Sequence, residues 1–252
     1  MAFEEQEMIS VVIATLGGDS LYETIKLLNA GTIVPDEIII SIPEQYSHRL
    51  DGIKIKNVKI LKTPVKGQVA QRAMGFNESV GDFVLQLDDD IFLDEACVEE
   101  LIKTLKKNGK NTVAGAGFYD MSTAKPLYKK VDKSKFFQNF YYWLVNGSDG
   151  YVQGSIDKAG MSIGVNYATL TEDEVKVEWL AGGCVAHYKS NLLLKNFYPY
   201  EGKAYCEDLI HSYLLSSTGC KLLANKKAKC YIETFKSYDL RFHEFWDFFK
   251  SD

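Results

Sequence analysis

The chain has 252 residues, 46% of them apolar, which is enough to bury one substantial core in a single elaborated domain. Its 29 basic and 34 acidic residues give a net charge of -5, which argues against a site that mainly neutralises a nucleic-acid backbone. Five scattered cysteines, none in a CxxC pair, indicate buried thiols rather than a disulfide framework or a zinc cluster.

The sequence shows no signal for export and no segment that would span a membrane. Residues 1–7 are acidic where a secretory leader would be basic, and no run of about 18 apolar residues occurs. We therefore expect a cytoplasmic protein. An aromatic tail, residues 236–252, could hold it peripherally at the inner face of the membrane.

The first half alternates short apolar runs with helical patterns, which is typical of a mostly parallel sheet flanked by helices. Ser20 and Glu23 form a capping box that predicts a helix start, and Asp94 is expected to cap a later helix that stops at Gly109. The predicted strands are 8–15, 37–42, 58–61, 82–87 and 112–118, and the predicted helices are 20–29, 68–80 and 94–108.

The regular pattern is lost over residues 120–173, which are rich in aromatics and then in glycines. It returns in predicted strands at 175–180, at 184–188 and near Cys230, and in helices starting at Ser190 and covering 207–217. The run 136–143 contains six aromatic residues, more than one buried helix face can hold, so we expect exposed rings that stack on a sugar or a lipid. The loop over 146–160 would then be a lid that orders with substrate.

Three acids, Asp88, Asp89 and Asp90, follow a buried strand at the edge where open α/β sheets bind ligands. In extended geometry Asp88 and Asp90 point the same way about 6.7 Å apart, which suits a hard cation and an adjoining part of its ligand. The rival interpretation, an acidic turn that caps the next helix, fits Asp94 better.

A second acidic pair, Glu207 and Asp208, opens a predicted helix. Simple capping explains such a pair, because the helix dipole favours acids at that end. The functional interpretation is a general base, since sugar transfer needs a carboxylate within reach of the acceptor hydroxyl.

Two glycine-containing segments complete the set of motifs. Gly67 and Gln68 open a helix that carries Arg72 one turn further in, an arrangement that suits phosphate, although a lone arginine is commonplace. The pair Gly182 and Gly183 separates two apolar runs and is explained equally well by a plain hairpin turn or by close approach of a ligand to the backbone.

In chain order these elements resemble the family 2 glycosyltransferases of the glycosyltransferase A (GT-A) fold, over about residues 9–233. The specific part of the resemblance is the run of motifs between residues 67 and 90. The resemblance as a whole implies an α/β fold, with one Rossmann-like domain over 1–235 whose mostly parallel central sheet is flanked by helices. The nucleotide-binding half would cover about 8–118, and a smaller mixed acceptor-side region about 119–235.

The resemblance also implies roles for individual residues. Asp208 would be the catalytic base, and Asp90 the metal ligand for Mn²⁺ or Mg²⁺. The donor would be bound by Thr15, Gly67, Gln68, Arg72, Asp88 and Asp89, and the acceptor and the transferred sugar by Trp179, Gly182, Gly183 and Glu207.

Three departures from the family pattern matter. The first strand ends in Ala14-Thr15-Leu16-Gly17-Gly18 instead of Pro-Thr-Tyr-Asn, so only Thr15 carries over. The acidic run that normally reads the nucleobase is replaced by Ser41-Ile42-Pro43-Glu44, which leaves base recognition unassigned. Where many members have a histidine metal ligand the chain has Glu233, the expected substitute.

The expected activity is inverting transfer of a sugar from a nucleotide-diphosphate sugar to a hydroxyl of a glycan or lipid-linked glycan, in bacterial surface polysaccharide or glycoconjugate synthesis. We expect no nucleic-acid partner. Two other classes remain open: a metal-dependent nucleotidyltransferase or phosphatase, and a non-catalytic protein that binds nucleotide sugars on the same fold. A phosphatase of the haloacid dehalogenase type would carry its paired aspartates after the first strand, where this chain has none.

Overall fold

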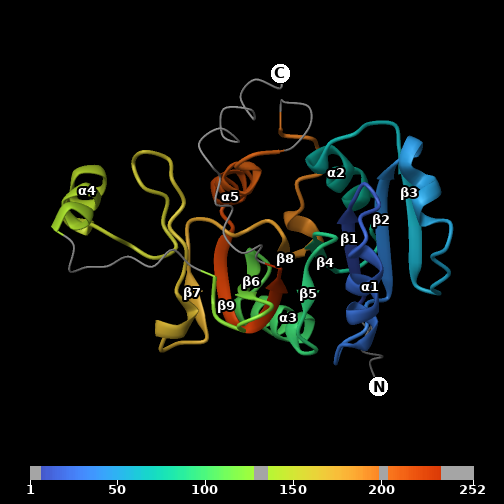
Figure 1. The fold of residues 1–252 in the computed structure, drawn as a ribbon, viewed down its shortest axis with the longest axis horizontal. Coiled ribbons are helices and arrows are strands. Elements are labelled where there is room, and N and C mark those ends of the chain that lie inside the picture. Colours follow the sequence, from blue (N-terminus) through green and yellow to red (C-terminus); the bar gives the residue numbers. More distant parts are fainter. Residues whose placement is uncertain (1–6, 128–135, 199–203, 234–252) are drawn as a thin grey trace.

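A computed structural model describes residues 7–127, 136–198 and 204–233, and the strands among them form one sheet (Figure 1). The sheet order is β3-β2-β1-β4-β8-β6-β9-β5, and β7 pairs with β9. The strands are β1 (Ile9–Ala14), β2 (Glu37–Pro43), β3 (Val58–Thr63), β4 (Phe83–Leu87), β5 (Phe92–Leu93), β6 (Thr112–Asp120), β7 (Glu174–Lys176), β8 (Cys184–Tyr188) and β9 (Lys221–Ile232). The α-helices are α1 (Leu21–Ala30), α2 (Gln68–Glu78), α3 (Cys97–Asn108), α4 (Phe136–Asn146) and α5 (Glu207–Ser217).

The first half of the sheet is parallel and is covered on both faces. Strands β3, β2, β1 and β4 pair in parallel. Along β1, Val11 and Ile13 pack with α1 and α3, whereas Val12 packs with Phe76 of α2 on the opposite face. Because successive side chains of a strand point to opposite faces, this two-sided burial explains why the sequence shows continuous apolar runs here.

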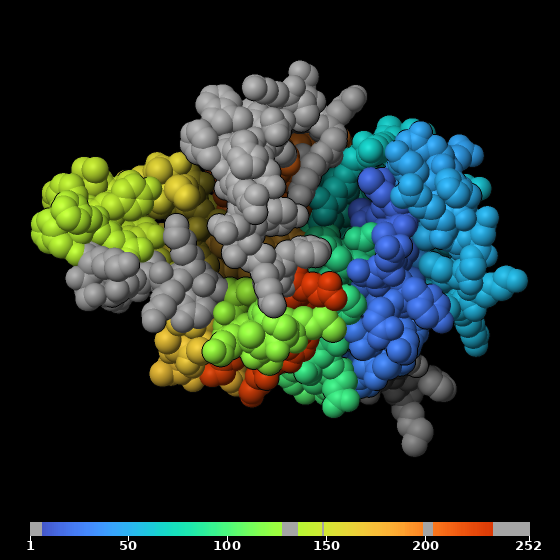
Figure 2. All heavy atoms as spheres, in the orientation of Figure 1, coloured from blue at the N-terminus to red at the C-terminus, as the bar shows by residue number. Residues whose placement is uncertain are grey.

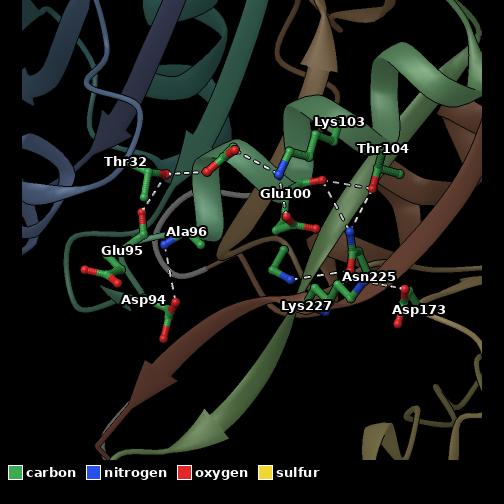
Figure 3. A network of polar contacts seen from close by, with 12 residues as sticks. Thr32, Asp94, Glu95, Ala96, Glu100, Lys103, Thr104, Asp173, Asn225 and Lys227 are labelled. Atoms are coloured by element: carbon green, nitrogen blue, oxygen red, sulfur yellow. Dashed lines mark hydrogen bonds and ion pairs between the residues drawn. The ribbon is translucent and has the colours of Figure 1, made fainter.

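The second half of the sheet is mixed, as predicted. β8 runs antiparallel to both β4 and β6, while β6 and β9 are parallel with a register shift between Ala116 and Gly117. At this irregularity the Asn225 side chain donates to Thr104 Oγ1 of α3 (2.8 Å) and accepts from the backbone N–H of Lys227 (2.7 Å), as Figure 3 shows. The bulge is thereby fixed against α3, and β9 continues to Ile232 beside β6.

The predicted elements of the first half are confirmed and Gly109 ends α3 as predicted, but both predicted N-terminal caps are wrong in detail. Ser20 has helical backbone angles (φ -74°, ψ -19°) instead of the extended angles of a capping residue, and its side chain makes no capping hydrogen bond. Helix α3 begins at Cys97, and the Asp94 carboxylate accepts from the N–H of Ala96 at 3.3 Å. Strand β5 was not predicted, and the predicted strand 175–180 is shorter, as β7.

Helix α4 confirms the expectation of exposed aromatic rings. Phe137 is 84% exposed and Phe136 74%, while Tyr142 is buried. Figure 1 shows this helix apart from the sheet, and in Figure 2 its atoms form one end of the molecule. The loop that follows carries its own hydrogen bonds, including two from backbone N–H groups to Asp157 Oδ1, and the proposed closing of this loop over substrate stays a prediction. Among the described residues no helix is long and apolar enough to cross a membrane, and the tail 236–252 lies outside them.

Candidate active site

A cleft of about 620 Å³ lies at the carboxyl end of β4. The chain leaves β1 toward β2 on one side, and β4 lies on the other side of β1, so this edge is a switch point of the kind where α/β sheets bind ligands. The cleft brings together eight of the residues singled out in the sequence: Gln68, Asp88, Asp90, Gly182, Gly183, Glu207, Asp208 and Glu233.

Asp88 is fixed at the end of β4 by three groups. Its backbone N–H donates to the Gly183 carbonyl at 2.9 Å. Its Oδ1 accepts from Gln68 Nε2 at 3.1 Å and from Arg72 Nη2 at 2.5 Å. The side chain is therefore preorganised before any ligand enters.

Arg72 joins the two acidic motifs. Its guanidinium is only 3% exposed and pairs with Asp88 and with Glu207. Glu207 is itself buried at the start of α5, where burial raises the pKa of its carboxyl and the Arg72 charge opposes that shift. The buried arginine needs both carboxylates, the buried one of Glu207 and the part-buried one of Asp88, because an unpaired charge in the interior is costly.

Gly182 forms the wall beside this network. A Cβ at Gly182 would lie 2.9 Å from Glu207 Oε1 and 3.3 Å from Gln86 Nε2, closer than ordinary contact. Gln86, a polar residue inside the apolar strand β4, donates its amide to the Gly182 carbonyl at 2.5 Å. The glycine is thus explained by close packing of polar side chains against the backbone.

Asp208 lines the cleft one residue after Glu207. Its carboxylate is half-buried, and burial raises its pKa above the usual range. The residue before the helix, Cys206, has left-handed backbone angles (φ 56°), which are uncommon for a residue with a side chain and are often found at functional sites.

A second cavity of about 490 Å³ is lined by Thr15, Gly67, Gln68 and Asp89, all predicted donor-binding residues. The Thr15 hydroxyl donates to the Asp89 carboxylate. Gln68 lines both cavities, so the two spaces adjoin at the start of α2.

Two predicted site residues occupy other positions. Arg72 lies behind the cleft and lines neither cavity, so its observed contacts make it a positioning residue. Trp179 also lines neither, and its indole N–H donates to the Ile163 carbonyl at 3.0 Å. Arg49 and Lys66, in contrast, line the second cavity and were not predicted, because an isolated basic residue carries no pattern.

The described residues contain no preformed group of three His, Cys, Asp or Glu side chains able to hold a metal. Asp90 and Glu233 both line the cleft, and both are exposed. Carboxylates of this kind fit a cation of the Mg²⁺ type, which usually takes one or two protein carboxylates and completes its shell with phosphates and water.

Two buried histidines, His187 of β8 and His211 of α5, lie close to each other. Neither ring nitrogen of His187 has a hydrogen-bond partner among the described residues, and its ring centroid is 5.5 Å from that of His211. Burial lowers the pKa of both imidazoles, that of His211 to about 4, and the positive charge of Arg72 adds to the effect at His211. Both rings are therefore neutral in the folded protein at pH 7.

Two comparisons with known proteins found similarities, one in sequence and one in fold. Residues 10–153 match the family model described as glycosyl transferase family 2. The fold is similar to that in the crystal structure of GalNAc-T7 with UDP, GalNAc and Mn²⁺, with a TM-score of 0.65 and 18% sequence identity. Similarity at this level of sequence identity shows the fold alone. The match covers 92% of this chain and 44% of that one, so the chain spans less than half of that protein. No curated protein matches the sequence.

Replacing Arg72 with methionine should lower the free energy of unfolding by about 3–5 kcal/mol, because Asp88 and Glu207 would lose their shared partner inside the protein. The matched control is Lys59→Met, which removes an exposed ion pair to Glu78 and should cost at most about 1 kcal/mol. Urea denaturation measures both. Equal losses in the two variants would contradict the structural role of Arg72.

Stability should fall as the pH drops from about 6.5 to 4, because the unfolded histidines take up protons that the buried rings exclude. For His211 the loss between pH 7 and pH 5 is about 2 kcal/mol. The raised pKa values of Glu207 and Asp208 make these acids change stability in the opposite direction as the pH falls. Variants are therefore needed to separate the contribution of His211 from that of the acids. Denaturation at both pH values should show a smaller loss in His211→Gln and the wild-type loss in His48→Gln, an exposed site. The same pH dependence in all three proteins would rule out His211.

Proposed function

The chain belongs to glycosyl transferase family 2 and has the GT-A fold, and on that premise we propose that it moves a sugar from a nucleotide-diphosphate sugar to a hydroxyl of a glycan acceptor with inversion. One observation carries the proposal. The strand end with Asp88 and Asp90 lines the same cleft as the half-buried carboxylate of Asp208. Donor-binding acids and a proton acceptor therefore line one space, as a transfer reaction requires.

The donor is assigned to the parallel half of the sheet. Asp88, held by Gln68 and Arg72, gives the donor a fixed wall at the point where the two cavities adjoin. A divalent cation, Mn²⁺ or Mg²⁺, held by Asp90 and Glu233, would supply positive charge beside the diphosphate. The solved structure similar to this chain contains UDP and Mn²⁺, which supports this choice of donor and cation.

The acceptor is assigned to the side of the cleft formed by α5 and the turn of Gly182. Asp208 takes the proton from the attacking hydroxyl, and its raised pKa makes it a stronger base than an exposed aspartate. The oxygen then bonds to the anomeric carbon as the bond to the diphosphate breaks. A single displacement of this kind inverts the anomeric configuration.

The cleft also offers a surface for a sugar ring. Tyr205, which is 61% exposed, and Phe118 both line it. Aromatic faces of this type pack against the apolar face of a sugar. We therefore propose a glycan or lipid-linked glycan as acceptor, in surface polysaccharide or glycoconjugate synthesis. The five cysteines are free thiols, consistent with the proposed cytoplasmic location.

One assay separates this function from its rivals. A nucleotide sugar is incubated with Mn²⁺ and a panel of glycan acceptors, and the products are resolved. Transfer releases a nucleoside diphosphate and an elongated glycan, a nucleotidyltransferase or phosphatase releases other phosphate products, and a binding protein leaves the donor intact. Absence of an elongated glycan across a broad panel of donors and acceptors would contradict the proposal.

Nucleoside diphosphate binding should depend on the cation. Without it, Asp90 and the diphosphate repel each other, so UDP affinity measured by calorimetry should fall at least about tenfold in EDTA relative to Mn²⁺. Asp90→Asn should reproduce the EDTA result in the presence of Mn²⁺. Asp51→Asn, an exposed position outside both cavities, is the control and should bind normally. Unchanged UDP affinity in EDTA would show that the cation takes no part in binding the diphosphate.

Asp208→Asn should lower turnover by about 10²–10⁴ while donor affinity survives, because the amide keeps the shape but accepts no proton. Asp149→Asn is the control, since Asp149 is exposed and lines neither cavity. Glu207→Gln should instead lower the melting temperature, since it removes a charge that balances Arg72. Near-normal turnover in Asp208→Asn would refute the assignment of the base.

A further inference from the structure

The second cavity has a cationic wall that the proposed function does not yet use. Tyr46, in the short 3-10 helix Glu44–Leu50, is flanked by two cations. The Arg49 guanidinium carbon lies 4.8 Å from the centre of the ring, and Lys66 Nζ lies 5.6 Å from it. Both side chains also line the cavity.

The position of Arg49 is built into the loop after β1. Its Nη1 donates to the Leu16 carbonyl at 2.9 Å. Gly17 has a positive φ (80°), and a Cβ there would lie 2.8 Å from the Arg49 Cβ. Gly17, which lies where the chain departs from the usual family sequence, therefore makes room for Arg49. The arginine is a fixed wall of the cavity, held by the loop and by the Tyr46 ring.

The two cations have no acidic partner in the part of the chain that the structure describes. Among the described residues neither Arg49 nor Lys66 forms an ion pair with a carboxylate. The acid among the residues that line the cavity is Asp89, and it accepts from the Thr15 hydroxyl. The lining of the cavity thus offers an accepting carboxylate at Asp89 and donating cations at Arg49 and Lys66.

We infer that Arg49 and Lys66 read the nucleobase of the donor and select a base that presents a carbonyl oxygen, uracil or guanine, over its amino counterpart, cytosine or adenine. This inference rests on the proposed function. The order of groups in a nucleoside diphosphate matches the site: phosphates beside Asp88 and Asp90, ribose hydroxyls at Asp89, and the base beyond them.

The hydrogen-bonding chemistry of the two cations determines which nucleobases they favour. Arginine and lysine side chains only donate hydrogen bonds, so they favour uracil O4 or guanine O6. The amino groups of cytosine and adenine at the equivalent positions also donate, and would leave a cation unpaired. The acidic run that reads the base elsewhere in the family is absent after β2, and this cationic wall takes its place.

The test is calorimetric titration of the full chain in Mn²⁺ with UDP, CDP, GDP, ADP and inorganic pyrophosphate. Wild-type protein should bind UDP at least tenfold more tightly than CDP, or GDP at least tenfold more tightly than ADP. Arg49→Met should weaken the preferred nucleotide about tenfold and leave its amino counterpart and pyrophosphate unchanged, because only the carbonyl contact is lost. Lys62→Met, exposed on β3 and outside both cavities, should behave as wild type. Melting temperatures confirm that each variant is folded.

Two results would overturn the inference and leave the proposed function standing. The first is that wild-type protein binds UDP and CDP equally tightly and also binds GDP and ADP equally tightly. The second is a loss in Arg49→Met that is as large for pyrophosphate as for the nucleotides, which would make the cations phosphate ligands. If neither pyrophosphate nor any of the four nucleotides binds wild-type protein in Mn²⁺, both the inference and the proposed donor fail.

Discussion

The site depends on one buried arginine. Arg72 comes from α2, its partner Asp88 from the end of β4, and its other partner Glu207 from the start of α5. Each of these charges is expensive to remove from water, and the cost is offset only while all three stay together. The pairing therefore fixes the helix that carries the proposed base relative to the strand end that carries the proposed donor ligands. Catalysis by positioning needs such a rigid support.

The two halves of the sheet around this arginine contribute different parts of the site. The parallel half presents strand ends and the start of α2 to the second cavity, and the mixed half closes the cleft with α5 and the turn at Gly182. Gln68 stands where the two spaces adjoin and also holds Asp88. The two adjoining spaces thus join the cationic wall of Arg49 and Lys66 to the acidic cleft that the proposed catalytic base, Asp208, lines.

The sequence located the motifs that depend on neighbouring residues. A buried strand ending in acids places Asp88 and Asp90 at the sheet edge, and a helix starting with acids places Glu207 and Asp208 at its first turn, because strand and helix periodicity are local properties. The parallel half of the fold follows for the same reason. Side-chain directions are harder to predict, as Trp179 illustrates. Its indole N–H donates to the Ile163 carbonyl outside the cleft, and the spacing of residues in the sequence does not indicate this partner.

By itself the sequence determined the fold class, the order of most elements and the acidic clusters. Tertiary structure alone decided which distant residues meet. Arg72 and Glu207 are 135 positions apart, and Arg49 reaches the cavity only because Gly17 leaves space for it. A lone arginine has no periodic pattern, and its role depends on the charges that folding brings beside it. Arg72 is consequently a structural support behind the cleft, while Arg49 lines the second cavity without an acidic partner among the described residues.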